Sequence, residues 1–205
     1  MKKRLLILCI VLGILLLFCS CKKKERNPNA AIEYLKNLNS YTCDVNLHIK
    51  NSKQEIDKEC KQFYHNKYGN RLDINKDRVL IYNEKDIRVN DLNNNMNYIL
   101  EKEFDSVYKL SFIQEYIGLL YTDEEISNSF KKIGDREYQL VRLTIPGNNR
   151  NINKAVMYIN LENNYPEKVL IYDSKDNEIL SFTYSNFMPN PEIQKEIFYI
   201  QKTKE

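Results

Sequence analysis

The sequence is poor in glycine, histidine and tryptophan, and these shortages exclude several classes of protein. Five glycines occur among 205 residues, and one of them, Gly13, lies in an apolar N-terminal run. The other four are far apart, so they cannot form the glycine-rich loop that cradles a phosphate group. Two histidines and no tryptophan offer too few side chains for most metallohydrolase and catalytic-triad chemistries. Composition therefore favours a binding or structural protein over an enzyme.

The chain also lacks an excess of charge outside its N-terminal segment. The formal net charge is +3, and three cations stand together at Lys2, Lys3 and Arg4. Without the first 20 residues, basic and acidic residues are equal in number. A neutral chain offers no extended basic surface, so we expect no nucleic-acid partner.

The N-terminal segment has the layout of a bacterial export signal. Basic residues precede an apolar run over 5–18, which is shorter than the ~20 residues that a membrane-spanning helix needs. Ser20 followed by Cys21 then resembles a lipobox, the cleavage and acylation site of bacterial lipoproteins. We therefore predict a lipoprotein signal peptide over 1–20 and palmitate on Cys21. An uncleaved anchor helix and plain secretion are the alternatives.

The predicted lipidation places the rest of the chain outside the cytoplasm, anchored to a membrane through its lipid. Residues 21–27 are polar and charged, and they are expected to form a short tether. No composition shift or repeat divides the remainder. We therefore expect a single domain over 28–205.

Hydrophobic spacing predicts helices near the start and in the middle of this domain. Asn27-Pro28 is typical of a helix start, and apolar residues then recur at helical spacing. A second helix is expected over 105–121. Thr122 and Glu125 form a capping-box pattern, which predicts a third, short helix to about Phe130.

Most of the remaining chain alternates between apolar and polar residues, as strands do. The first predicted strand runs from Tyr41 to Lys50, with its odd-numbered side chains on the buried face. Asparagine-rich steps are expected to form turns, since Asn tolerates the left-handed conformation. Successive hairpins around a helical insertion predict an α+β fold with one large curved antiparallel sheet and helices on one face. The further strands are expected at 56–68, 78–83, 85–90, 96–102, 136–145, 153–161, 167–173 and 178–187.

Two cysteines, Cys43 and Cys60, lie outside the N-terminal segment. In an extracytoplasmic protein such a pair is a candidate disulfide. A hairpin over 41–64 with Cys43 opposite Cys60 also pairs Leu47 with Ile56, so the apolar faces agree. We predict the intrachain disulfide. The alternatives are two buried free thiols, or one thiol bridging two chains.

The same two cysteines and both histidines, His48 and His65, could in principle bind zinc. Each cysteine stands five residues before a histidine, so on a strand the two side chains point to opposite faces ~16 Å apart along the strand. One tetrahedral ion cannot reach both, and no metal site is expected. No serine has the sequence context of a catalytic nucleophile, and no cofactor is indicated. The chain is therefore not expected to be an enzyme.

The C-terminal part, residues 155–198, carries several features in a fixed order: a turn with proline, an apolar strand, an Asn-Phe step, an Asn-Pro-x-Ile step and a late phenylalanine. These are Tyr165-Pro166, Val169 with Ile171, Asn186-Phe187, Asn190 to Ile193, and Phe198. In this stretch the chain resembles the LolA-like lipoprotein-carrier superfamily. The resemblance implies an incomplete antiparallel barrel that holds helices in its concave face.

With the Ser20-Cys21 motif, its length and its Lys/Asn/Ile-rich composition, the chain also resembles the GerS group of clostridial spore-germination lipoproteins. That resemblance implies a non-catalytic protein on the outer forespore membrane. It would bind and activate a zinc-dependent cell-wall amidase that modifies cortex peptidoglycan for germination, and it could form a homodimer.

The competing hypothesis is a carrier or sensor of lipids or other apolar ligands at the cell surface, as distant LolA-like relatives are. A carrier needs an open apolar cavity of several hundred cubic ångströms. Phe112, Tyr116 and Tyr121 are bulky enough to fill such a space. Their presence favours the amidase activator over the carrier.

Overall fold

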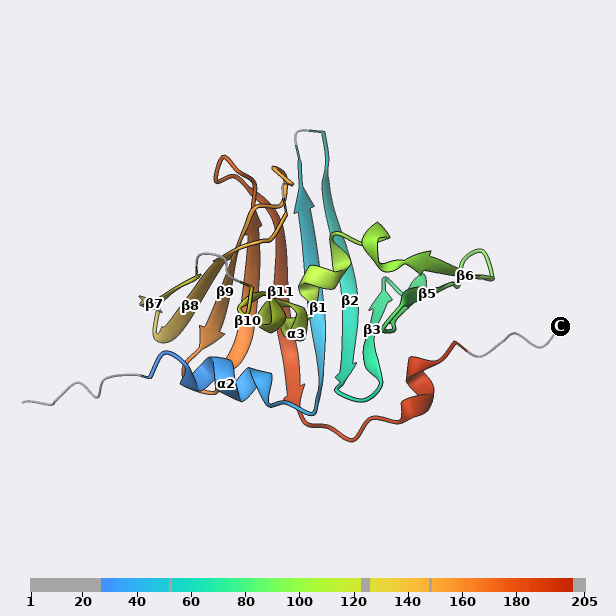
Figure 1. Cartoon of the computed structure of the whole chain (residues 1–205), viewed down its shortest axis with the longest axis horizontal. Coiled ribbons are helices and arrows are strands. Elements are labelled where there is room, and N and C mark those ends of the chain that lie inside the picture. The colour runs from blue at the N-terminus through green and yellow to red at the C-terminus, as the bar shows by residue number, and fades with distance from the viewer. Residues whose placement is uncertain (1–26, 52, 123–125, 148, 201–205) are drawn as a thin grey trace, which may run out of the picture.

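The computed structural model describes residues 27–51, 53–122, 126–147 and 149–200. These residues form one antiparallel sheet in the strand order β6-β5-β4-β3-β2-β1-β11-β10-β9-β8-β7. Among the described residues the two end strands have a single strand partner each, so the sheet is open. Figure 1 shows β1 and β2 at the middle of a curved sheet, with α3 in front of it and α2 along its lower edge. The fold class expected from the sequence is confirmed.

The elements follow one another mainly as hairpins, with a helical insertion between β6 and β7. The strands are β1 (Ser40–Lys50), β2 (Glu55–His65), β3 (Gly69–Ile74), β4 (Arg78–Tyr82), β5 (Asp86–Asp91), β6 (Met96–Glu101), β7 (Ile126–Ile133), β8 (Arg136–Thr144), β9 (Lys154–Asn160), β10 (Tyr165–Tyr172) and β11 (Glu178–Pro189). The helices are α2 (Ala30–Lys36) and α3 (Ile113–Leu119), with 3-10 helices η1 (Lys102–Phe104), η2 (Tyr108–Ser111) and η3 (Lys195–Phe198).

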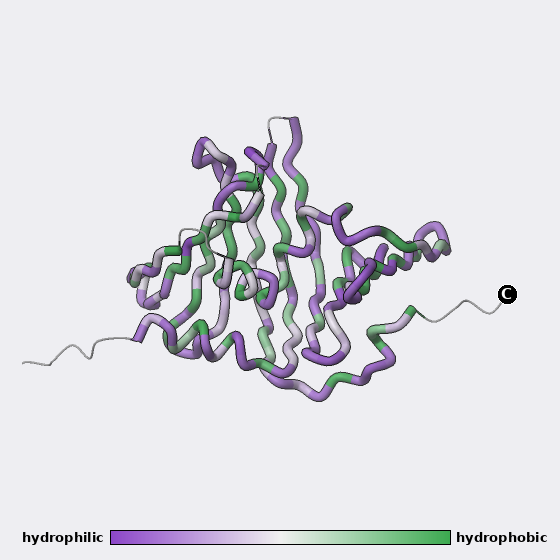
Figure 2. The backbone as a smooth tube through the Cα atoms, in the orientation of Figure 1, coloured by the Kyte–Doolittle hydropathy of each residue, from purple (hydrophilic) through white to green (hydrophobic). Residues whose placement is uncertain are grey.

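Alternation along the central strands sets which face is buried. In β1 the side chains of Tyr41, Cys43, Val45 and Leu47 are buried in the main hydrophobic core, as expected. Their neighbours on β11 and the apolar residues of α2, η2 and α3 belong to the same core. Figure 2 shows hydrophobic and hydrophilic residues alternating along these strands, while the turns are mainly hydrophilic. The core therefore lies between the concave face and the helices.

The asparagine-rich turns are confirmed where the structure describes them. Asn95 and Asn164 have φ values of 51° and 62°, in the left-handed region that Asn tolerates. At the hairpin between β1 and β2, the Asn51 side chain accepts hydrogen bonds from the backbone N–H groups of Lys53 and Gln54, at 2.9 and 3.0 Å. The loop between the end of β1 and the start of β2 is therefore four residues long.

Four secondary-structure expectations are wrong. The helix predicted to reach Phe130 is instead strand β7, because pairing with β8 outweighs the local capping-box signal. The helix predicted over 105–121 is broken into η2 and α3 at Phe112, which has extended backbone angles. Strand β3 was not among the predicted strands, and α2 begins at Ala30 rather than after Asn27.

The chain after β11 forms a C-terminal strap that returns to β3. Asn190 accepts a hydrogen bond from the backbone N–H of Asn39 at 2.9 Å, at the start of the strap. Arg71 on β3 donates to the backbone carbonyl of Ile197 at 2.7 Å, and the Phe198 side chain is buried. The strap thereby runs from β11 past the ends of β1 and β2 and is held at β3.

Candidate functional site

The concave face is the place where a carrier of this fold would hold its ligand. Here the segment η2–α3 places Phe112, Ile113 and Tyr116 against the sheet, and these side chains are 0%, 0% and 2% exposed. Leu35 of α2 is equally buried in the same core, and Gln114 joins the two helices through a 2.9 Å hydrogen bond to its carbonyl. The centre of the concave face is therefore filled by the protein's own side chains.

Tyrosine hydroxyls fix this segment on the sheet. Tyr116 donates to the carbonyl of Val141 at 2.7 Å and accepts from the backbone N–H of Met157 at 3.1 Å. Tyr184 on β11 donates to the carbonyl of Ser111 at 2.7 Å. Burial raises the pKa of both tyrosines well above its ordinary value, so both stay neutral. These hydroxyls are used for positioning and offer no acid–base chemistry.

A buried carboxylate, Asp105, orders the start of η2. It accepts backbone N–H groups from Val107, Tyr108 and Lys109 at 3.0, 2.7 and 2.7 Å, and the hydroxyl of Tyr82 at 2.6 Å. Burial, followed by the charge of Asp105, raises the pKa of Tyr82. Each oxygen is satisfied, so this carboxylate has a structural explanation.

One residue expected to fill the interior does not do so. Tyr121 is 60% exposed, beyond the end of α3, and the Lys36 ammonium lies 4.5 Å from the centre of its ring. Tyr121 was expected inside because of its bulk, but α3 ends at Leu119, so Tyr121 lies beyond the helix that packs on the sheet.

The expected register of the two cysteines is wrong by two residues. The structure pairs Cys43 with Gln62 and Cys60 with Val45, because the Asn51 turn makes the loop two residues longer than expected. The two cysteines are diagonal neighbours on the buried face, and both are free thiols. Diagonal positions lie about 7–8 Å apart, beyond the usual disulfide distance. Pairing Cys43 with Cys60 would require a two-residue shift in the register of β1 against β2. The disulfide stays a prediction.

Both thiols are buried. Cys43 lies 3.6 Å from the side-chain oxygen of Gln62, and burial raises its pKa far above the ordinary value. Burial also raises the pKa of Cys60, to about 11. Both thiols are therefore protonated at neutral pH and poor nucleophiles.

The histidines lie apart from the cysteines. His48 points away from the core and contacts Asp57 and Glu55 at 2.8 and 3.0 Å, while the ring of His65 stacks on Tyr68 at 4.2 Å. Within the described ranges no group of three or more His, Cys, Asp or Glu side chains is arranged to hold a metal ion. The predicted lipidation residue, Cys21, lies outside the described residues.

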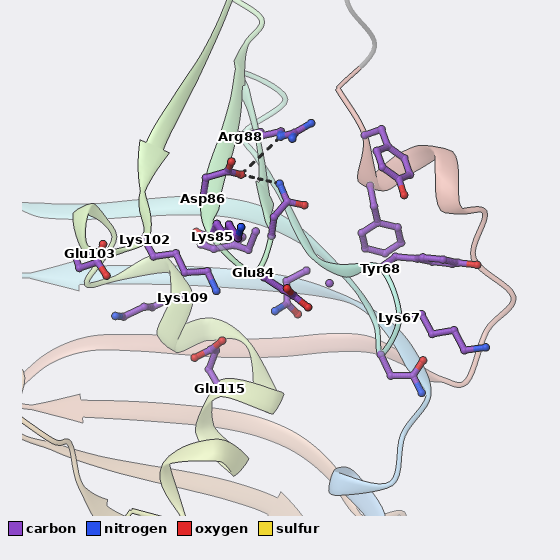
Figure 3. Close-up of a pocket in the computed structure, with 17 residues that line it drawn as sticks. Lys67, Tyr68, Glu84, Lys85, Asp86, Arg88, Lys102, Glu103, Lys109 and Glu115 are labelled. Atoms are coloured by element: carbon purple, nitrogen blue, oxygen red, sulfur yellow. Dashed lines mark hydrogen bonds and ion pairs between the residues drawn. The ribbon is translucent and has the colours of Figure 1, made fainter.

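A large polar pocket of about 840 Å³ opens at the ends of strands β2 to β5. Its walls come from the β2–β3 and β4–β5 turns, from η1, η2 and α3, and from the end of the C-terminal strap. Figure 3 shows charged side chains of both signs converging on it from these separate segments. Sequence reasoning missed this pocket, because no single segment carries a motif for it. We refer to it as the polar pocket.

A smaller hollow of about 210 Å³ lies between β4, β5, β6 and the start of η2. Its lining is mainly apolar, including Leu80, Val89 and Tyr98. The volume is below the 300–1,000 Å³ typical of small-molecule pockets. This apolar hollow is the part of the concave side that the helical segment leaves unfilled.

The class of the molecule is thus an open α+β half-barrel with a filled concave face. The chain belongs to the YdcC-like sporulation protein family, whose model matches residues 1–198. No curated protein is significantly similar to it in sequence. In the part of the chain that the structure describes, no helix has the length and apolar character that crossing a membrane requires.

Solved structures share this architecture at low sequence identity. An uncharacterized conserved protein from Thermus thermophilus has a TM-score of 0.57 at 9% identity, covering 86% of this chain and 93% of that one. A LolA superfamily protein from Nitrosomonas europaea has a TM-score of 0.46 at 11% identity, with 85% and 98% covered. The complex of the CwlD amidase with the GerS lipoprotein from Clostridioides difficile has a TM-score of 0.43 at 18% identity, with 82% and 98% covered.

Proposed function

We propose that this chain is a non-catalytic lipoprotein that binds a cortex peptidoglycan amidase and activates it during spore formation. The observation that carries the binding role is the filled concave face, where Phe112, Ile113 and Tyr116 occupy the space that a carrier would need. Membership of a sporulation family supports the stage at which it acts. The amidase is taken from the resemblance to the GerS group, which rests on the Ser20-Cys21 motif, the length and the Lys/Asn/Ile-rich composition of the chain.

Activation by binding requires that the lipoprotein bind the active conformation of the amidase more tightly than the inactive one. If zinc stabilises the active conformation, the lipoprotein raises the affinity of the amidase for zinc. By thermodynamic reciprocity, zinc then tightens the complex by the same factor.

The test is calorimetric titration of the full chain, in a non-ionic detergent, into a cortex amidase with and without zinc. We expect a saturable complex that is tighter with zinc, together with faster cleavage of cortex peptidoglycan. The GerS and CwlD proteins of Clostridioides difficile serve as a positive control pair. Absence of binding in both conditions would refute the activator, and hydrolysis of peptidoglycan by this chain alone would refute the non-catalytic role.

The lipid anchor is tested separately. Cells labelled with a palmitate analogue should modify the wild-type chain, and the Cys21→Ala variant should lose the label. Cys19→Ala, which removes the neighbouring cysteine, is the matched control and should keep it. Equal labelling of wild type and Cys21→Ala would contradict the predicted site and with it the outer forespore membrane as the location.

A second candidate function, carriage of apolar ligands, is favoured by the apolar hollow alone. At about 210 Å³ this hollow holds little more than one large side chain. A fluorescent fatty-acid analogue distinguishes the two functions: an activator should leave its emission unchanged, whereas a carrier should bind it stoichiometrically.

A further inference from the structure

Several charged side chains that line the polar pocket have no ion-pair partner among the described residues. Lys67, Lys85, Lys102 and Lys109 line it from the β2–β3 turn, the β4–β5 turn, η1 and η2. Among the described residues none of these four ammonium groups lies within ion-pair distance of a carboxylate. Since the four come from separate segments, their convergence results from the fold and not from one lysine-rich stretch.

Carboxylates line the same pocket. Glu84, Glu103 and Glu115 are also without an ion-pair partner in the described part of the chain. By contrast, Asp86 is already held by Asn83 at 2.9 Å and by Arg88 at 3.7 Å. A polyanion would be attracted by the lysines and repelled by the three glutamates, so the lining matches a ligand that carries both signs.

An amide at the wall of the pocket has an unmet hydrogen-bonding requirement. Asn70 lines the pocket from β3, and its side-chain oxygen is buried without a hydrogen-bond partner. Buried polar atoms are nearly always satisfied, so such an atom calls for an explanation. A rotation of this side chain toward the pocket breaks no hydrogen bond of that oxygen, and a ligand N–H can then satisfy it. Peptide groups supply such donors at regular spacing.

The far wall is aromatic. Tyr68 packs between His65, at 4.2 Å, and Phe198, at 5.9 Å, and Tyr199 beside them is more than half exposed. Figure 3 places Tyr68 and Lys67 on this side, opposite Lys102, Lys109 and Glu115. A pocket of about 840 Å³ has room for several residues of an extended ligand between the two walls.

We propose that the polar pocket binds a short zwitterionic peptide, with free carboxylates facing the lysines and a free amino group facing the glutamates. The zwitterionic class follows from the pocket itself. The choice of a cell-wall stem peptide as its natural source rests on the proposed function. Binding at this site would give the lipoprotein its own contact with peptidoglycan, separate from any contact with an amidase.

The experiment titrates a synthetic stem pentapeptide containing diaminopimelate into the full chain in a non-ionic detergent, with no amidase present. We expect saturable binding that weakens as the salt concentration rises, because the contacts are between exposed charges. The peptide with acetylated amines and the peptide with amidated carboxylates should each bind roughly fivefold to tenfold more weakly. Inorganic polyphosphate should bind more weakly than the unmodified peptide.

Matched variants locate the site. Lys109→Gln should weaken binding of the unmodified peptide roughly fivefold and have little further effect on binding of the peptide with amidated carboxylates. Glu115→Gln should likewise weaken binding of the unmodified peptide and have little further effect on the peptide with acetylated amines. Lys132→Gln, at the other end of the sheet on β7, is the control and should bind as wild type. Asn70→Leu should reduce binding without lowering the free energy of unfolding, because it removes an unsatisfied acceptor.

Three outcomes would overturn the proposal: no saturation at millimolar peptide, binding that none of the pocket variants weakens, or polyphosphate binding more tightly than the peptide. Because the amidase is absent, failure here leaves the proposed activator untouched. Failure of the amidase titration in turn leaves a positive peptide result standing.

Discussion

The concave side of the sheet has two halves that differ in packing: one is filled by buried side chains, and the other is open and lined by charged ones. Beneath η2 and α3, bulky side chains such as Phe112 exclude water, and tyrosine hydroxyls such as that of Tyr116 are hydrogen-bonded. At the ends of β2 to β5, side chains such as Lys109 and Glu115 surround open space and have no ion-pair partner among the described residues. The comparison teaches that one sheet supports a tightly packed half and an open, charged half, so substitutions in each half should have different readouts.

The largest effect is expected from Phe112→Ala in the packed half. Phe112 is fully buried and its ring packs edge-on against Tyr82, with centroids 5.1 Å apart. Removing it leaves a cavity, so the free energy of unfolding should fall by about 3–5 kcal/mol. Urea denaturation followed by circular dichroism measures it. Lys109→Gln in the open half should change this free energy by less than about 0.5 kcal/mol, and equal effects would erase the distinction.

The next effect is expected at Gly69, where β3 begins beside the polar pocket. Its φ is +93°, and a Cβ there would lie 2.6 Å from the carbonyl oxygen of Tyr82. Gly69→Ala should therefore destabilise the protein by about 2–3 kcal/mol. Gly118→Ala in α3 is the matched control, because nothing lies within 4 Å of its Cβ, and it should be neutral or slightly stabilising. A neutral Gly69→Ala would contradict the close approach of β3 and β4.

A third effect depends on pH and tests the two buried thiols of the core. Burial raises the pKa of Cys43 and of Cys60, the latter to about 11, so each thiol ionises more readily when the chain unfolds. Their contribution to stability is complete below the ordinary thiol pKa of 9.0 and declines as the pH rises above it. From pH 7 to 9.5 the free energy of unfolding should fall by about 2 kcal/mol. The Cys43→Ala/Cys60→Ala double variant should lose most of this decline.

Alkylation distinguishes free thiols from a disulfide in the same sample. Peptide mapping after denaturation without reductant should show both Cys43 and Cys60 alkylated if they are free, as in the structure, and neither alkylated if the predicted disulfide forms. The folded protein should label slowly at neutral pH. If denaturation left both unlabelled until a reductant was added, the strands would have to pair in the shifted register.

Alternation in the sequence was enough to predict the packed half but not the register within it. Tyr41, Val45 and Leu47 face the core as predicted, because period-two spacing specifies a face. A slide of two residues keeps every side chain on its face, so the same pattern could not distinguish Cys43 opposite Cys60 from Cys43 opposite Gln62. The deciding feature was the Asn51 turn, a local hydrogen-bonding arrangement that hydrophobic spacing does not report.

The polar pocket could not be predicted from the sequence, for a different reason. Lys67, Lys85 and Lys109 are ordinary charged residues in three separate segments, and each would be expected at a solvated surface. They share a pocket because β3 and β5 bring two turns to the same end of the sheet and because Asp105 fixes the start of η2. Sequence spacing carries no information about such convergence when no segment has a motif of its own.

The smallest effect is expected at the β3–β4 turn, at the end of these two strands away from the polar pocket. Asn75 and Lys76 have φ values of 47° and 61° at the tip of the hairpin. Such a turn favours Asn-Gly, because a residue with a Cβ is strained in the left-handed region while glycine is not. Lys76→Gly should therefore raise the free energy of unfolding by about 0.5–1 kcal/mol, the gain being reduced by the greater freedom of glycine in the unfolded chain.

The neighbouring residue provides the control that shows whether this gain comes from the backbone conformation. The Asn75 side chain accepts a hydrogen bond from the backbone N–H of Glu59 at 2.9 Å, tying the turn to β2. Asn75→Gly relieves the same kind of strain but loses this bond, so it should lower the free energy of unfolding by a few tenths to about 1 kcal/mol. Urea denaturation of both variants measures the difference. If both were stabilised, the Asn75 bond would contribute nothing, and if both were destabilised, strain at Lys76 would not be the limiting feature of the turn.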